Sequence, residues 1–149
     1  MLNILPSLIF IFQPTPVKVK VENFSSIKKV ESRDVTFGVK ETVEELISSK
    51  GYNPVSDTSE GFDLQVHIDS IYSPQQVLNI FGMKWLRKDY VVESSMCLGT
   101  KCVKSRGVRK TFIFAALLDI ENNEIPLNRK SFSKALESSL KECTENLAK

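Results

Sequence analysis

The chain has 149 residues, of which 42% are hydrophobic and 26% charged, and its formal net charge is +2. A chain of this length fits one domain and can bury enough surface to fold without a metal or a disulfide. The composition excludes a disordered chain, and the small net charge excludes a protein that acts as a polycation along its whole length.

An apolar run at Leu8–Phe12 dominates the first sixteen residues. A secretory signal requires a basic residue before such a run and a small-residue cleavage site after it, and the sequence contains neither. The run is also about half as long as a membrane-spanning helix. Residues 1–16 are therefore interpreted as a signal-like segment, as an apolar arm or strand that pairs with a sheet or a partner, or as a membrane anchor.

Two local patterns define the next elements. Val17–Val21 alternates valine with lysine, which predicts a half-buried strand near a sheet edge, and residues 22–35 are polar and irregular. Asp34 or Thr36 is expected to cap a following helix, and Gly51 to end it. The apolar stripe of this helix consists of Val39, Val43, Leu46 and Ile47.

A second strand is predicted at Phe62–Asp69, where apolar and polar residues alternate. Residues 73–89 are expected to form an irregular connection with one helical turn at Gln76–Ile80. The side chains of the second strand that we expect to face the core are Phe62, Leu64, Val66 and Ile68.

The last third of the chain predicts an extended segment at Tyr90–Leu98 and a long strand at Val103–Ile120. Glu121–Glu124 is a candidate hairpin turn, and Ile125–Arg129 a short return strand. A second helix then ends the chain, with Ser131 or Ser133 as its cap. Its apolar stripe consists of Phe132, Leu136, Leu140, Cys143 and Leu147.

The predicted order is β-α-β-β-β-(β)-α, which places residues 17–149 in a single α+β domain. An antiparallel sheet of four to five strands, with two helices packed on one face, accounts for the short turns and for the polar, solvent-exposed face of each strand.

No catalytic, metal or cofactor site is predicted. His67, the only histidine, stands on the polar face of a strand and is interpreted as a surface imidazole. A structural zinc site requires four Cys or His ligands at short pairwise spacings, which the three cysteines do not provide, and Cys143 on the helix stripe is interpreted as a core residue. The sequence contains no nucleotide-binding, serine-hydrolase or metalloprotease motif, so we expect a protein that is not an enzyme.

Cys97 and Cys102 flank a turn that contains Gly99. This spacing allows a disulfide between two strands, which would form only in an oxidising compartment. The alternative is two reduced thiols in a hairpin.

Basic residues concentrate between positions 84 and 110. This stretch contains eight basic and two acidic residues, so its net charge is +6. With Trp85 and Tyr90 nearby, this stretch could neutralise phosphates and stack on bases. A solvated sheet face or a contact with an acidic protein is favoured, because residues 109 and 110 point to opposite faces of a strand. The candidate basic contact surface consists of Lys84, Arg87, Lys88, Lys101, Lys104, Arg106, Arg109 and Lys110.

The element pattern resembles that of a family of small bacterial envelope domains. It comprises the strand Val17–Val21, the helix VKETVEELISSKGYNPV, the strand opening GFDLQVHIDSI and the terminal helix FSKALESSLKECTENL. The pattern is similar to that of YajG-type lipoproteins and, more distantly, of CsgG and the N-terminal domain of TolB. The lipidated cysteine that follows the signal in that family is missing here. The resemblance implies a binding or assembly role.

We therefore expect a non-enzymatic protein-binding or assembly module, exported to the periplasm or associated with the outer membrane, that acts through its sheet face or edge. The expected partner is a protein, self-association included. Residues 1–12 offer a membrane contact, and nucleic acid is not expected as a partner. The alternative is a structural subunit of a larger assembly, such as a phage virion, with a retained N-terminal arm.

Overall fold

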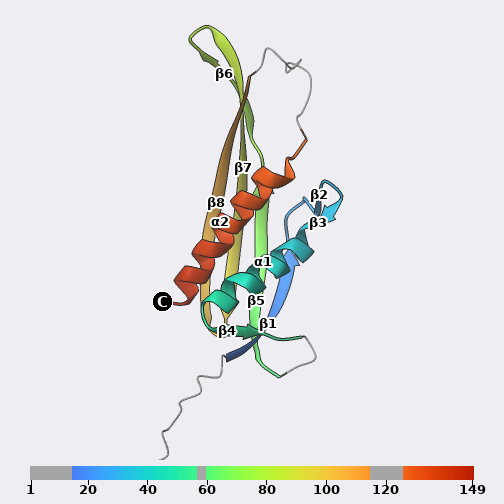
Figure 1. Cartoon of the computed structure of the whole chain (residues 1–149), viewed down its shortest axis with the longest axis vertical. Helices are drawn as coiled ribbons and strands as arrows, with labels where there is room; N and C mark the ends of the chain where they lie inside the picture. The colour runs from blue at the N-terminus through green and yellow to red at the C-terminus, as the bar shows by residue number, and fades with distance from the viewer. Residues whose placement is uncertain (1–14, 57–59, 115–125) are drawn as a thin grey trace, which may run out of the picture.

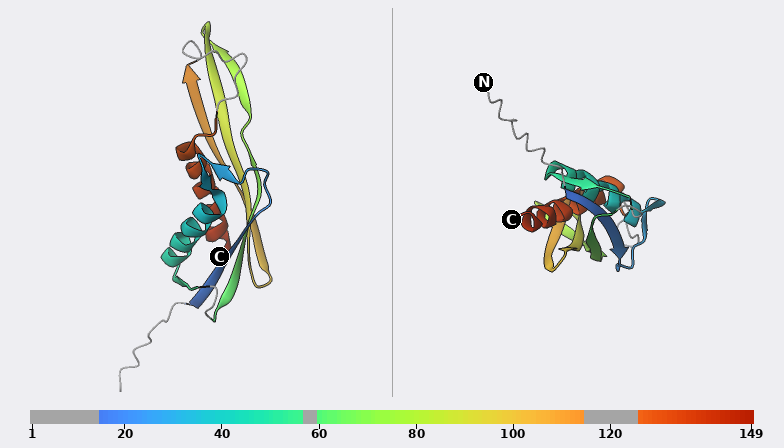
Figure 2. Two further views of the ribbon diagram at one scale, coloured as in Figure 1. Left: turned by 90° about the vertical axis from the view of Figure 1, so that its right-hand side faces the viewer. Right: turned by 90° about the horizontal axis from the view of Figure 1, so that it is seen from below.

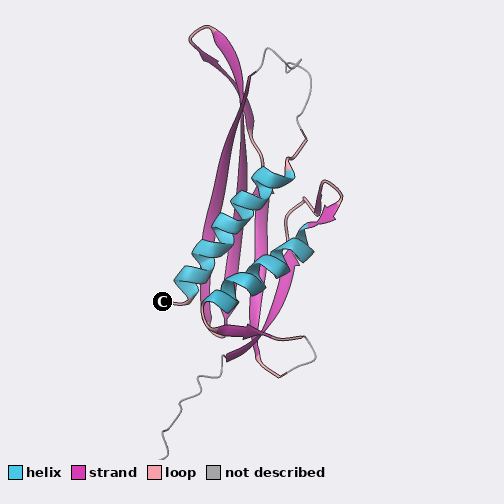
Figure 3. Cartoon of the chain, in the orientation of Figure 1, coloured by secondary structure: helices cyan, strands magenta, loops and turns pink. Residues whose placement is uncertain are grey.

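The computed structural model describes residues 15–56, 60–114 and 126–149, which form a curled sheet with two helices on one face (Figures 1 and 3). The apolar run at Leu8–Phe12, the predicted turn at Glu121–Glu124 and the end of the predicted long strand lie outside the described residues. The strands of the sheet are β1 Thr15–Asn23, β4 Tyr52–Pro54, β5 Phe62–Tyr72, β6 Gln75–Ile80, β7 Met83–Leu98 and β8 Lys101–Phe114. The remaining elements are a small hairpin, β2 Lys29–Val30 with β3 Arg33–Asp34, and the helices α1 Val35–Ser49 and α2 Arg129–Leu147.

The α+β class is confirmed, but the prediction of a purely antiparallel sheet of four to five strands is wrong. The sheet has six strands in the order β4-β1-β5-β7-β6, with β8 on the other edge of β7. β1 pairs in parallel with both β4 and β5, and the other pairings are antiparallel. The parallel pairs arise because α1 carries the chain back across the sheet between β1 and the two strands that flank it.

The prediction of an irregular connection over residues 73–89 is also wrong, because this stretch holds β6 and the first half of β7. β6 pairs with residues 83–88 of β7, and β5 pairs with residues 91–98 along the same edge. Gln75–Ile80 has no clear alternation, so its pairing with β7 rather than its own pattern specifies the strand.

The predicted first helix is confirmed as α1. Asp34 is its cap: the carboxylate Oδ1 accepts hydrogen bonds from the backbone N–H groups of Thr36, at 2.7 Å, and Phe37, at 3.3 Å. Gly51 follows the helix with a φ of 88°, a conformation that glycine adopts without steric cost.

The second helix begins earlier than predicted. Asn128 caps α2 by accepting a hydrogen bond from the N–H of Ser131, at 3.0 Å, so neither Ser131 nor Ser133 is the cap. The predicted return strand Ile125–Arg129 is wrong in its described part, because residues 126–128 form no strand and Arg129 opens the helix.

The core lies between the sheet and the two helices. α1 packs on β1, β4 and α2, whereas α2 packs on β7 and β8. Leu64, Val66 and Ile68 of β5 are buried as predicted, but Phe62 is 64% exposed because it is the first residue of the strand, at the end of the sheet. The other large, fully buried side chains of this cluster come from β1, β7 and both helices: Val17, Val19, Val39, Val43, Val92, Met96, Leu140 and Cys143.

The outer end of the sheet is a ribbon of three strands that continues beyond both helices (Figures 1 and 2). It consists of the β6–β7 hairpin and the adjoining end of β8, which pairs with β7 as far as Trp85↔Phe114.

Candidate interaction surfaces

The long edge of β8 is the first candidate surface. β8 pairs only with β7 among the described strands. The two strands are joined by the two-residue turn Gly99–Thr100, so Leu98 and Lys101 form a hydrogen-bonded pair. Along the ladder from this pair, non-hydrogen-bonded and hydrogen-bonded pairs alternate. It follows that the even-numbered residues of β8 direct their backbone N–H and C=O groups away from β7, toward the open edge.

Cys97 and Cys102 occupy one of the non-hydrogen-bonded pairs of this ladder. Their Cα atoms lie 4.1 Å apart, close to the separation of about 4.5 Å that is usual for such a pair, and their sulfur atoms are bonded. The pairing supports the alternation deduced from the turn. The disulfide also links β7 to β8 beside the Gly99–Thr100 turn, at the end of the sheet opposite to the β6–β7 turn.

The predicted basic residues lie on both faces of the sheet rather than on one. Pairing alternation places Arg87, Lys104, Arg106 and Lys110 on the face away from the helices. Lys84, Lys88, Lys101 and Arg109 point to the helical side, where Lys88 is buried.

Several of these basic side chains have partners within the chain. Arg87 forms a two-point ion pair with Asp89, with nitrogen–oxygen distances of 2.9 and 2.8 Å, and this hydrogen bonding raises the pKa of the guanidinium. Arg106 donates to the Tyr72 hydroxyl at 3.0 Å and lies above the ring. Lys101 donates to the backbone carbonyl of Leu147 at the end of α2, at 3.0 Å.

The same outer face continues onto β1 and β5. Lys20 and Lys18 lie 3.2 and 3.3 Å from the carboxylate of Asp63, and their hydrogen bonds lower its pKa. His67 is half-buried, with its ring edge-on to that of Phe24 at 5.1 Å between centroids. On the same face, Ser95 lies opposite His67 in the ladder and donates a hydrogen bond to the carboxylate of Asp69 at 3.3 Å.

A groove between the two helices is the second candidate surface. It encloses about 740 Å³ between the β2–β3 hairpin, α1 and α2. Its lining combines apolar Leu46 and Phe132 with the carboxylates of Glu41 and Glu45. Gly38 also lines the groove, and a Cβ atom added there would meet nothing within 4 Å.

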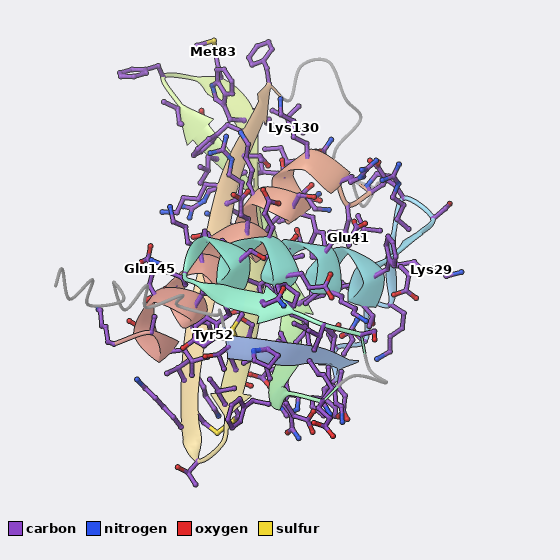
Figure 4. All side chains as sticks on the ribbon, turned by 60° about the horizontal axis from the view of Figure 1, so that its bottom comes forward. Lys29, Glu41, Tyr52, Met83, Lys130 and Glu145 are labelled. Carbon is purple, nitrogen blue, oxygen red and sulfur yellow. A yellow bond between two sulfur atoms is a disulfide. The ribbon has the colours of Figure 1, made fainter. Side chains whose placement is uncertain are left out.

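The end of the three-stranded ribbon is the third candidate surface. Exposed apolar side chains gather there. Sequence reasoning missed four of them because residues 73–89 were expected to be irregular, and the fifth, Phe112, lies on β8 opposite Arg87. Figure 4 shows Met83 at the end of the ribbon, far from the helices. We call these residues the apolar tip: Val77, Ile80, Phe81, Met83 and Phe112.

No metal-binding cluster occurs within residues 15–56, 60–114 and 126–149. In the same described segments, neither helix is long and apolar enough to cross a membrane. Cys143 is buried, and burial raises the pKa of its thiol.

Comparison with known proteins identifies the fold. The chain is similar to PelC from Paraburkholderia phytofirmans, a protein solved as a dodecamer, with a TM-score of 0.50 and 11% identity over 92% of this chain and 88% of that one. This likeness shows a shared fold. No protein-family model matches the sequence, and no curated protein matches it, so the relation to YajG-type domains stays a prediction.

Two bacterial lipoproteins are more distant structural neighbours. A minor lipoprotein from Acinetobacter baumannii has a TM-score of 0.43 and 8% identity over 90% of this chain and 89% of that one. The rare lipoprotein B from Shewanella oneidensis has a TM-score of 0.37 and 14% identity over 88% and 87%.

Proposed function

We propose that this protein is a non-enzymatic assembly module of the bacterial envelope that self-associates through the open edge of β8. The observation that carries the proposal is the length and register of that edge. β8 has fourteen residues, and alternate residues along it direct their backbone groups outward. Such an edge adds a strand from a second chain through main-chain hydrogen bonds.

The side chains around this edge suit a protein contact. Lys104, Arg106 and Lys110 are exposed on the outer face beside the edge, and Val108 between them is 41% exposed. The lysines discourage unspecific strand addition, so a matching partner must supply carboxylates or avoid the lysines by its register. The PelC neighbour, which shares the fold, is a dodecamer, and this supports self-association as the mode of assembly.

An envelope location is part of the proposal. A disulfide between Cys97 and Cys102 persists in an oxidising compartment such as the periplasm, and the apolar Leu8–Phe12 offers a signal-like segment for export. The lipoprotein-like fold is compatible with a protein of the periplasm or the outer membrane.

The test replaces Val108 by proline in the full chain. The N–H group of residue 108 points to the open edge, so Val108→Pro removes one outward donor and leaves the hydrogen bonds to β7 intact. The matched control, Val108→Thr, keeps both the donor and the β-branched side chain.

We expect light scattering after size exclusion to show an oligomer for the wild type and for Val108→Thr, and a monomer for Val108→Pro with an unchanged circular dichroism spectrum. A wild-type monomer at a chain concentration of about 100 μM, or an oligomer that survives the proline, would refute assembly through β8.

A further inference from the structure

We propose that the apolar tip inserts into the surface of a bilayer that contains anionic phospholipid. This membrane contact lies at the end of the β6–β7–β8 ribbon. It goes beyond the assembly function, because it uses the end of the strands rather than the edge of β8.

The exposure of the apolar tip is the first observation. Phe81 is 96% exposed, and the other four side chains are between 40% and 53% exposed. Single exposed apolar residues are ordinary, but five of them on one small projection indicate a surface that binds something apolar.

The backbone at Phe81 is the second observation. Phe81 and Gly82 form the two-residue turn between β6 and β7, with φ values of 51° and 76°. Such a turn favours asparagine followed by glycine, and a bulky residue at a positive φ places its Cβ atom too close to the following carbonyl oxygen, which strains the backbone. Because Phe81 is 96% exposed, no packing against the described residues compensates for the strain. Its ring therefore has a role outside the chain.

The charges around the apolar tip select the partner. Arg109 and Lys110 are exposed near Phe112, opposite Tyr90 and Asp89 in the ladder, and the carboxylate of Asp89 is bound by Arg87. The described residues 75–88 and 107–114 contain no acidic side chain. Arg87 is excluded from this set because it is paired with Asp89. An apolar end with basic side chains at its base matches a bilayer, whose hydrocarbon lies just beneath a layer of anionic headgroups.

The size of the tip favours a bilayer over a protein partner. A standard protein interface takes about 20–30 residues from each side, whereas the tip offers five apolar side chains on the end of three strands. A lipid surface requires no matching shape, and aromatic and aliphatic tips enter it without ordering a second chain.

The chain carries its own reporter for the test. Trp85, the only tryptophan, lies two residues after Met83 and contacts the ring of Phe114 at 5.1 Å between centroids. We expect its fluorescence emission to shift to the blue when vesicles of phosphatidylglycerol and phosphatidylcholine are added to the full chain. The apolar Leu8–Phe12 gives the chain a second route to lipid, and a contact through that segment alone would leave the Trp85 emission unchanged.

The decisive variant is Phe81→Asn, because asparagine suits the turn and removes the ring without loss of folding. We expect co-flotation with the anionic vesicles to fall about tenfold or more, as loss of one buried aromatic side chain implies, and the Trp85 shift to disappear. The matched control is Phe37→Asn, which removes a phenylalanine that is 66% exposed on α1 and should leave vesicle binding unchanged.

A second pair of substitutions tests the charge. Arg109→Gln with Lys110→Gln should reduce binding to the anionic vesicles severalfold and leave the weak binding to pure phosphatidylcholine unchanged. Equal binding of the wild type to both vesicles, or full binding by Phe81→Asn, would overturn the proposal. So would a loss of self-association by Phe81→Asn in the absence of lipid, because the tip would then be a protein contact.

Discussion

Gly107 sets the distance between the second helix and the sheet. A Cβ atom added to this residue of β8 would lie 1.9 Å from the carbonyl oxygen of Ala135 and 2.7 Å from the amide nitrogen of Ser139, both backbone atoms of α2. One turn of the helix therefore rests directly on the strand. Beside this contact, Ser94 and Ser139 share a buried hydrogen bond of 2.6 Å.

We expect Gly107→Ala to lower the free energy of unfolding by about 3 kcal/mol or more, because the methyl group forces α2 away from the sheet. Urea unfolding followed by circular dichroism measures this change. The matched control is Gly38→Ala on α1, where the new methyl group meets nothing and alanine favours the helix by about 1 kcal/mol. Equal stabilities of the two variants would contradict the close packing at Gly107.

Single residues also show where periodicity is a poor guide to exposure. Phe62 continues the alternation of Leu64 and Val66, and the sequence alone placed it in the core. Burial ends where the covering layer ends, however, and a strand terminus lies at that boundary. Lys88 is the reverse case, a charged residue that is buried on the helical side of the sheet.

At the scale of elements, the two helices begin at caps of the same kind, and sequence predicted only one of them. Asp34 immediately precedes a clear apolar stripe and was recognised as a candidate. Asn128 precedes Arg129 and Lys130, and the stripe of α2 starts only at Phe132, so a later serine was favoured. The structure shows that two basic residues lie in the first turn of α2.

Removal of the first cap should weaken α1. We expect Asp34→Ala to destabilise the protein by about 1 kcal/mol, since the N–H groups of Thr36 and Phe37 lose their acceptor. Asp34→Asn keeps an acceptor at the same position and should remain within a few tenths of a kcal/mol of the wild type. Thermal unfolding of the three proteins compares them, and an equal loss in both variants would show that charge rather than capping stabilises this end.

At the scale of the whole molecule, the three cysteines report two properties: whether the β7–β8 hairpin is oxidised, and whether α2 covers the core. Cys97 and Cys102 are bonded, and the Cys143 thiol is buried with a raised pKa, which disfavours its reactive thiolate form. We expect an alkylating reagent to modify no thiol in the native, unreduced protein. Mass spectrometry should then find one modified thiol after unfolding and three after unfolding with reduction.

The contrary result is equally clear. Three thiols modified after unfolding without a reductant would show a reduced hairpin, and the argument for an oxidising compartment would be lost. Rapid labelling of one thiol in the native protein would show instead that α2 does not cover Cys143.

The sequence by itself determined the elements whose side chains repeat with a clear period: β1, α1, β5 and the stripe of α2. Each repeat marks one face to be buried, and a local pattern is enough to identify it. It also placed Cys97 and Cys102 across a turn, because a glycine and a spacing of five residues are local features.

Only the tertiary structure decided how those elements are joined. The parallel pairing of β1 with β5, the strand β6 and the apolar tip depend on which strand lies beside which, and those contacts join residues far apart in the chain. The physical reason is that strand pairing uses backbone groups that every residue carries, so its partners leave little trace in the sequence.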